Sequence, residues 1–170
     1  MSVLPILCWP DPRLSVVCDA VSSVTAEMQD LADDMLETMY AAPGRGLAAP
    51  QVGHLLRLFV MDVTWKEGAP APQFFFNPVI ADASDTMATH SEGCLSIPGV
   101  TAEVARPDRV RLTWTDRAGV TDTAWFEGFA AACVQHELDH LNGRVTLDHL
   151  EPSVRVRTVE AYEAYKEALT

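Results

Sequence analysis

The alternation of apolar and polar residues predicts a helix near the start of the chain. Between Thr25 and Ala42, methionines and leucines recur at the spacing of one helix face. Thr25 is a suitable N-cap, and the Pro43-Gly44 pair stops the helix. We interpret these methionines as core residues rather than as ligands.

Three further segments have the patterns of strands. Residues 55–63, LLRLFVMDV, form an apolar run that is typical of a strand buried on both faces, and residues 74–80, FFFNPVI, predict a second strand. Over residues 109–126, apolar residues alternate with polar ones on both sides of DRAG, which has the chemistry of a turn. This last segment therefore predicts a β-hairpin.

A second helix is predicted to carry the sequence QHELDH, residues 135–140. The segment FAAACVQHELDHLNGR is rich in alanine and mostly uncharged at its start, which indicates burial in the middle of the domain. Asn142-Gly143 offers a left-handed stop, and an exposed terminal helix is expected over residues 154–169. We therefore predict an α+β fold, with antiparallel β-sheets around the QHELDH helix, an N-terminal helix and a C-terminal helix.

Length and composition favour a single domain over residues 1–170, of which 48% are hydrophobic. Twelve basic against 24 acidic residues give a net charge of -12, which argues against binding to nucleic acids or anionic membranes. The four cysteines are scattered, so we expect reduced thiols rather than disulfides. The sequence shows no apolar run of membrane-spanning length and no signal-peptide pattern at its start, and we expect a cytoplasmic protein.

QHELDH contains the pattern H-E-x-x-H, which indicates a metal site. One helical turn separates His136 from His140, so both side chains lie on one face and can share an ion. Glu137 stands where it can reach a molecule bound to that ion. The alternative is a charged helix surface with two solvated histidines. Two histidines do not complete such a centre, which needs a third protein ligand and an open position.

The best third ligand is Cys94, in the stretch EGCLSIPG, residues 92–99. Gly93 permits an unusual backbone there, and we expect Pro98-Gly99 to form a turn, so that a rigid loop presents the thiolate to the helix. Taken alone, Cys94 is more often a small buried hydrophobic residue. Its combination with QHELDH favours the ligand role.

Three motifs, GRGLAAPQ (residues 44–51), EGCLS (92–96) and QHELDH, resemble the signature motifs of the peptide deformylase family, in order and separation. The resemblance covers nearly the whole chain. It implies hydrolysis of the N-formyl group of the initiator methionine of new polypeptides, with release of formate. It also implies one divalent metal ion, Fe²⁺ in the cell, which Zn²⁺, Ni²⁺ or Co²⁺ can replace in purified protein.

The resemblance also implies roles for individual residues. Cys94, His136 and His140 would hold the metal, and Glu137 would take a proton from water and return it to the leaving amine. The side-chain amide of Gln51 and the backbone N–H of Leu95 would stabilise the oxyanion. Gly46 would hydrogen-bond the substrate backbone.

Two positions depart from the family pattern where substrate is expected. Arg45 stands between the two glycines of the first motif, where an apolar residue is usual, and Thr101 stands where an arginine is usual. We expect the lost arginine to weaken peptide binding and the charge of Arg45 to favour acidic peptides. The candidates for the pocket that receives the methionine side chain are His90, Phe129, Ala132 and Cys133.

Two other functions remain open at this point. One is an H-E-x-x-H peptidase, although such enzymes ordinarily use a histidine or carboxylate as third ligand. The other is a deformylase-derived module that recognises peptide N-termini without efficient catalysis. For an active enzyme we expect N-formyl-methionyl peptides as substrates, and we expect a monomer. We expect at most transient contact with the ribosome, because the tail from Glu151 has three basic and four acidic side chains and so carries a charge of -1.

Overall fold

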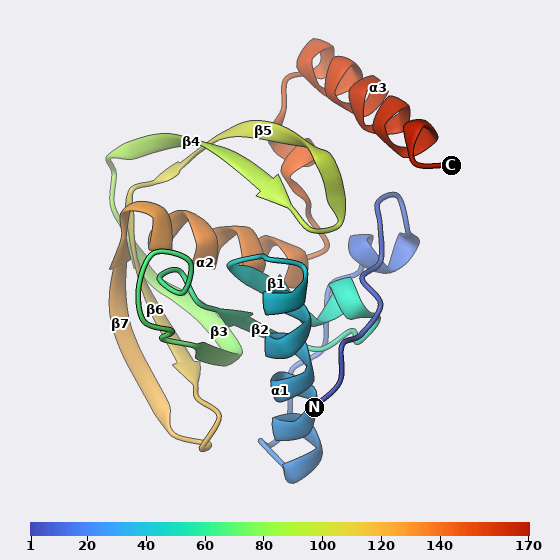
Figure 1. Cartoon of the computed structure of the whole chain (residues 1–170). Coiled ribbons are helices and arrows are strands. Elements are labelled where there is room, and N and C mark those ends of the chain that lie inside the picture. The colour runs from blue at the N-terminus through green and yellow to red at the C-terminus, as the bar shows by residue number, and fades with distance from the viewer.

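The computed structural model describes all 170 residues and has an α+β architecture, as predicted (Figure 1). A five-stranded antiparallel sheet has the order β1-β2-β3-β6-β7, and β4 and β5 form a separate two-stranded hairpin. The helices and strands are α1 (Ala26–Ala41), β1 (Gly46–Ala48), β2 (Leu58–Met61), β3 (Gln73–Ala83), β4 (Met87–Cys94), β5 (Ile97–Pro107), β6 (Arg109–Thr115), β7 (Thr121–Glu127), α2 (Gly128–Leu141) and α3 (Pro152–Ala168).

Helices α1 and α2 cover opposite faces of the large sheet, and strand β2 shows how. Its residues Leu58 and Val60 pack in the cluster that contains the methionines of α1, whereas Phe59 and Met61 pack in the cluster that contains α2. Alternate residues of a strand point to opposite faces, so this strand is buried on both sides. The apolar run that predicted a doubly buried strand is confirmed.

The local signals at the ends of elements are also confirmed. The Thr25 hydroxyl accepts a hydrogen bond from the backbone N–H of Met28 and caps α1. Strands β6 and β7 form the predicted hairpin, with a turn over residues 116–119. Helix α2 stops before Gly143, whose φ of 73° is left-handed.

Helix α2 is the central helix of the fold. One side packs against the large sheet through residues such as Val134 and Leu138, and the other side contacts the β4–β5 hairpin. Most of the helix from Ala131 onward is buried. The histidines of QHELDH therefore lie in the interior, as the alanine-rich sequence predicted.

The β4–β5 hairpin has no counterpart in the sequence analysis, which expected a rigid loop with a turn at Pro98-Gly99. Cys94 is the last residue of β4 and pairs with Ile97, so the turn lies at Leu95 and Ser96. The expected turn position was wrong, because Pro98 and Gly99 lie within β5. Gly99 adopts a left-handed φ of 85° without ending the strand.

None of the helices combines the length with the apolar composition that a membrane span requires.

Candidate active site

Three potential metal ligands converge where the β4–β5 turn faces helix α2. Cys94 comes from the end of β4, and His136 and His140 come from one face of α2. Their ligand atoms all lie within 4.8 Å of one another. The Cys94 Sγ atom is 3.4 Å from the Nε2 atom of His140. A thiolate and two imidazoles at this separation form a donor set suited to a divalent transition metal.

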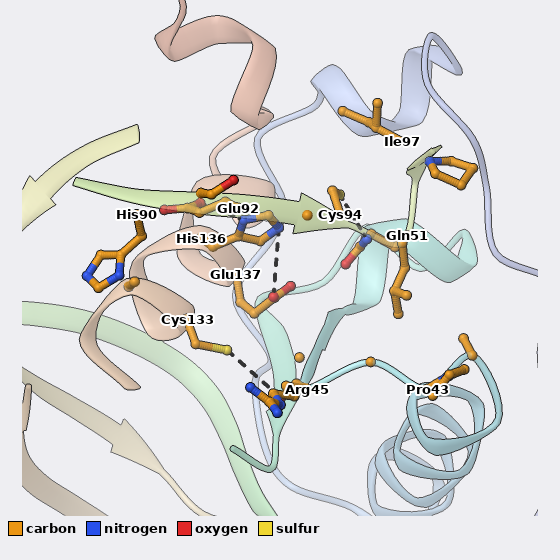
Figure 2. A pocket seen from close by; sticks show the side chains of 18 of the residues that line it. Pro43, Arg45, Gln51, His90, Glu92, Cys94, Ile97, Cys133, His136 and Glu137 are labelled. Carbon is orange, nitrogen blue, oxygen red and sulfur yellow. Dashed lines mark hydrogen bonds and ion pairs between the residues drawn. The ribbon is translucent and has the colours of Figure 1, made fainter. Parts of the chain in front are cut away.

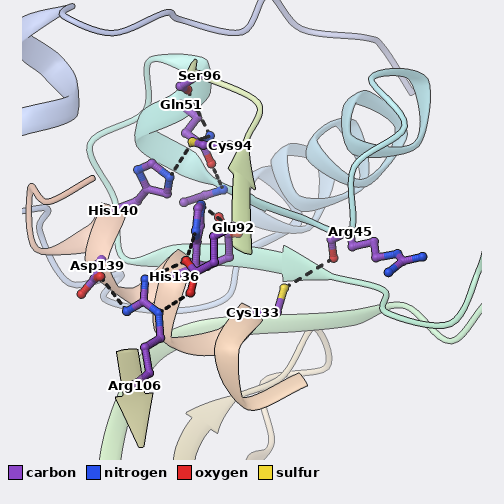
Figure 3. Close-up of polar contacts among 12 residues, drawn as sticks. Arg45, Gln51, Glu92, Cys94, Ser96, Arg106, Cys133, His136, Asp139 and His140 are labelled. Atoms are coloured by element: carbon purple, nitrogen blue, oxygen red, sulfur yellow. Dashed lines mark hydrogen bonds and ion pairs between the residues drawn. The ribbon is translucent and has the colours of Figure 1, made fainter. Parts of the chain in front are cut away.

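A buried network orients the first of these histidines (Figure 3). The Nδ1 atom of His136 lies 2.9 Å from Glu92, a carboxylate that can only accept, so Nδ1 carries the hydrogen and Nε2 is free to bind a metal. Arg106 donates two hydrogen bonds to Glu92, at 2.7 and 2.9 Å, and a third to Asp139, at 2.9 Å. His149 contacts the same oxygen of Asp139 at 2.7 Å.

The electrostatic environment favours positive charge at this point. Burial by itself would raise the pKa of Glu92, but the hydrogen bonds from His136 and Arg106 lower it to about 2. Burial would likewise lower the pKa of His136, yet Glu137, Cys94 and Glu92 together raise it. The negative groups that would stabilise a protonated imidazole here also stabilise a divalent cation, so the residues present fit a metal ion.

The second histidine is held neutral, as a metal ligand must be. Burial lowers the pKa of His140 well below its usual value, and the charges of His136 and Arg106 act in the same direction.

Glu137 lies beside His136, one of the three residues whose ligand atoms converge. One of its carboxylate oxygens is 4.0 Å from His136 Nε2, and the other is buried without a hydrogen-bond partner. Burial, the largest influence, raises the pKa of Glu137 to about 7, although the neighbouring His136 opposes it. A buried carboxyl group with a pKa near neutrality is suited to move a proton in either direction.

Gly46 makes room for this carboxylate. A Cβ atom at Gly46 would lie 2.5 Å from the Oε2 atom of Glu137 and 3.0 Å from the Sγ atom of Cys133. Any larger residue would push Glu137 or the strand aside. The second glycine of GRGLAAPQ is therefore required by packing against Glu137, in addition to any contact with substrate.

Gln51 is fixed with its amide nitrogen toward Cys94. Its Oε1 atom accepts a hydrogen bond from the backbone N–H of Ala48 at 2.9 Å, and its Nε2 atom donates to the hydroxyl of Ser96 at 3.0 Å. The same nitrogen is 3.7 Å from the Cys94 sulfur. These contacts hold the amide nitrogen, a hydrogen-bond donor, next to Cys94.

A cavity of about 690 Å³ opens onto these groups (Figure 2). Most of the residues that the sequence singled out meet there, although they come from three separate parts of the chain. Only His140, among the site residues proposed from the sequence, is not part of the cavity lining. The lining includes Arg45, Gly46, Gln51, His90, Cys94, Leu95, Phe129, Ala132, Cys133, His136 and Glu137.

The two departures from the family pattern lie in different surroundings. Arg45 lines the cavity, where its guanidinium stands 5.2 Å over the ring of Phe129 and pairs with Glu67. Part of its charge is therefore neutralised within the protein. Thr101 is exposed on β5 and does not line the cavity, although its neighbours Gly99 and Val100 do.

The sequence analysis did not find the residues that support the ligands. Glu92 and Ser96 belong to the EGCLS motif, so the motif signalled them without a role. Asp139 likewise belongs to QHELDH, which signalled it without a role. The roles of Asp139, Arg106 and His149 depend on contacts between β5, α2 and the segment that follows α2, which the local sequence does not show. A charged residue within an otherwise alternating strand was the only hint of Arg106.

The fold and the site define a metal-dependent hydrolase, with an H-E-x-x-H helix that faces a cysteine on a hairpin. The chain belongs to the peptide deformylase family, enzymes that remove the N-formyl group. The family model described as polypeptide deformylase matches residues 3–156. The peptide deformylase of Mesorhizobium japonicum is 44% identical over 163 residues, which cover 96% of this chain and 93% of the relative.

Solved structures agree with this assignment. A peptide deformylase from Legionella pneumophila is similar with a TM-score of 0.93 and 36% identity, over 99% of this chain and 98% of the other. The peptide deformylase from Ehrlichia chaffeensis in complex with actinonin is similar with a TM-score of 0.91 and 39% identity, over 100% of both chains. The peptidase alternative is therefore set aside.

Proposed function

We propose that this chain removes the formyl group from the N-terminal formyl-methionine of newly made polypeptides and releases formate. Water adds to the formyl carbon, the bond from carbon to nitrogen breaks, and the nitrogen leaves as a protonated amine. The single observation that carries the proposal is the arrangement of Glu137 and the Gln51 amide around the point where Cys94, His136 and His140 converge, at the base of the cavity.

Cys94, His136 and His140 would hold one divalent ion. When bound, such an ion supplies Lewis acidity, which lowers the pKa of water toward neutrality. A thiolate with two imidazoles accepts several first-row metals. We propose Fe²⁺ in the cell, following the resemblance to the family, and Zn²⁺, Ni²⁺ or Co²⁺ as substitutes in purified protein.

Glu137 would carry the proton during hydrolysis. Its unpartnered oxygen is free to accept a proton from water, and its raised pKa allows it to pass that proton to the departing amine. The Gln51 amide and the Leu95 backbone N–H would donate hydrogen bonds to the oxygen that becomes negative. Gly46 would bind the substrate backbone at the opposite wall.

The side chain of the first residue would occupy the part of the cavity next to helix α2. His90, Phe129, Ala132 and Cys133 line this part, and Figure 2 shows His90 and Cys133 on the same side of Glu137. The buried thiol of Cys133 is un-ionised, because burial raises its pKa well above the usual value. An uncharged sulfur next to a phenylalanine suits the apolar thioether of methionine.

We also propose that the protein acts in the cytoplasm, where formylated chains are made, and as a monomer. The tail from residue 151, with its charge of -1, supports at most transient contact with the ribosome.

Formate release tests this function directly. We expect protein purified anaerobically with Fe²⁺ to release formate from formyl-Met peptides. The Glu137→Gln variant should keep its metal and lose most turnover, because the amide cannot accept a proton. Turnover near that of the wild type would refute the role of Glu137.

Metal analysis tests the third ligand. We expect the Cys94→Ala variant to lose tightly bound metal, whereas Cys8→Ala, which removes an exposed thiol, should keep a full equivalent. A full equivalent of tightly bound metal in Cys94→Ala would show that the proposed ligand is wrong.

A further inference from the structure

The C-terminal helix α3 packs directly against the start of strand β5 (Figure 1). Tyr162 is fully buried in a cluster that also contains Ile97, and Val100 packs against the same cluster. The hydroxyl of Tyr162 donates a hydrogen bond to the backbone oxygen of Trp9 at 2.7 Å. Tyr162 therefore fixes this helix beside the segment that follows Cys94.

One turn farther along, Tyr165 covers Gly99. A Cβ atom placed on Gly99 would overlap the ring of Tyr165, so the ring lies against the bare backbone of this glycine. Gly99 has a φ of 85°, a conformation that glycine adopts without strain. Because glycine has no side chain of its own to pack, the tyrosine ring supplies the packing that restrains the backbone at this point.

The restrained segment is also a wall of the substrate cavity. Ile97, Pro98, Gly99 and Val100 all line it. Figure 2 shows Ile97 and Pro43 on the side of the site that lies away from His90 and Cys133. If the first side chain occupies the part near α2, the rest of the peptide leaves along the wall formed by residues 97–100.

We propose that Tyr165 is a positioning residue for the peptide that follows the formylated residue. It holds the wall of residues 97–100 in the shape that binds the substrate backbone, which makes helix α3 a part of the substrate-binding unit. This inference rests on the proposed function, because it concerns the same cavity. Tyr165 lies against Gly99 and is not part of the cavity lining, so it acts through Gly99.

The expected effect is on substrate binding and not on the chemical step. Without the ring, the wall is free to adopt several conformations and must be ordered when a peptide binds. We expect Tyr165→Ala to raise KM for a formyl-Met tetrapeptide by about fivefold, to leave kcat unchanged, and to have little effect on formyl-Met amide, which ends before the wall.

Two further variants separate positioning from general stability. Tyr165→Phe keeps the ring and should restore the KM of the wild type. Val156→Ala shortens a side chain that is 56% exposed on the same helix and should change neither constant. Thermal unfolding of all three variants, with bound metal measured in each, shows whether the fold and the metal site are intact.

The outcomes distinguish this inference from the proposed function. If the wild type releases no formate, the proposed function fails. If the wild type is active and Tyr165→Ala lowers only the unfolding temperature, with KM for the tetrapeptide unchanged, Tyr165 is a structural residue and the inference is wrong. An equal rise in KM for the tetrapeptide and the amide would also overturn it, because the effect would not follow the length of the peptide.

Discussion

Replacing Glu92 by glutamine should weaken metal binding, although Glu92 is not itself a ligand. The carboxylate accepts hydrogen bonds from His136 and, twice, from Arg106, and it is only 9% exposed. Glutamine has nearly the same shape but no charge, and its amide group offers one acceptor oxygen in place of two. An amide oxygen in the place of Oε1 can still accept from His136 and from one nitrogen of Arg106, but the NH₂ group in the place of Oε2 cannot accept from the other nitrogen of Arg106.

The structure allows the size of the effect to be estimated. A hydrogen bond to a charged group contributes about 1.5 to 3 kcal/mol, and one such bond is lost. Arg106 keeps its contact with Asp139, so its buried charge retains a partner. The loss in the free energy of unfolding therefore stays near the lower end of that range. The imidazole of His136 loses its ionic partner, and loss of such a partner typically lowers metal affinity about 10- to 100-fold.

Competition with a chelator measures the metal dissociation constant, and denaturant titration of the metal-free protein measures the free energy of unfolding. The control is Glu103→Gln, which removes an exposed carboxylate from the same hairpin and should change neither quantity. A folded Glu92→Gln variant whose metal dissociation constant lies within twofold of the wild type would refute the reasoning.

Three other predictions concern the substrate and the tail. Thr101→Arg should lower KM for formyl-Met peptides by the equivalent of about 1 to 3 kcal/mol, because the arginine can bind the peptide, and should leave kcat nearly unchanged. An unchanged KM would identify position 101 as a neutral surface site. Arg45→Leu should reduce any preference for acidic over neutral peptides. The reduction should be about fivefold at most, because Glu67 already pairs with the arginine. Steady-state kinetics at low and high salt measure this preference. Arg109→Leu is its matched control, since that arginine also stacks on an aromatic ring and pairs with a glutamate, but outside the cavity. In sedimentation with ribosomes at physiological salt we expect weak binding, and deletion of residues 152–170 should not change it. Tight, salt-sensitive binding that disappears with the deletion would contradict this prediction.

Local patterns in the sequence were sufficient for several parts of the fold. The cap at Thr25 and the hairpin of β6 and β7 are present as predicted. The doubly buried strand that was predicted over residues 55–63 is present as the shorter strand Leu58–Met61. Each depends on residues a few positions apart, because helical and strand periodicities are fixed by the backbone. For the same reason, the spacing of His136 and His140 predicted that they share one helix face.

Long-range contacts decided the rest. The hairpin of β4 and β5 was missed, because the turn at Leu95 and Ser96 lacks glycine, whereas the nearby Pro98-Gly99 has the composition of a turn. Strand register, and not local composition, determined which residues turn.

The buried network behind the metal ligands shows the same limit. Arg106 lies 14 positions from Glu92 and 33 positions from Asp139 in the sequence, yet it bonds to both. Tyr165 likewise meets Gly99 only because helix α3 folds back onto β5. The sequence determined which residues carry the chemistry, through motifs that local geometry makes meaningful. The tertiary structure determined which residues hold them in place, because burial and pairing of distant charges exist only once the strands and helices have packed.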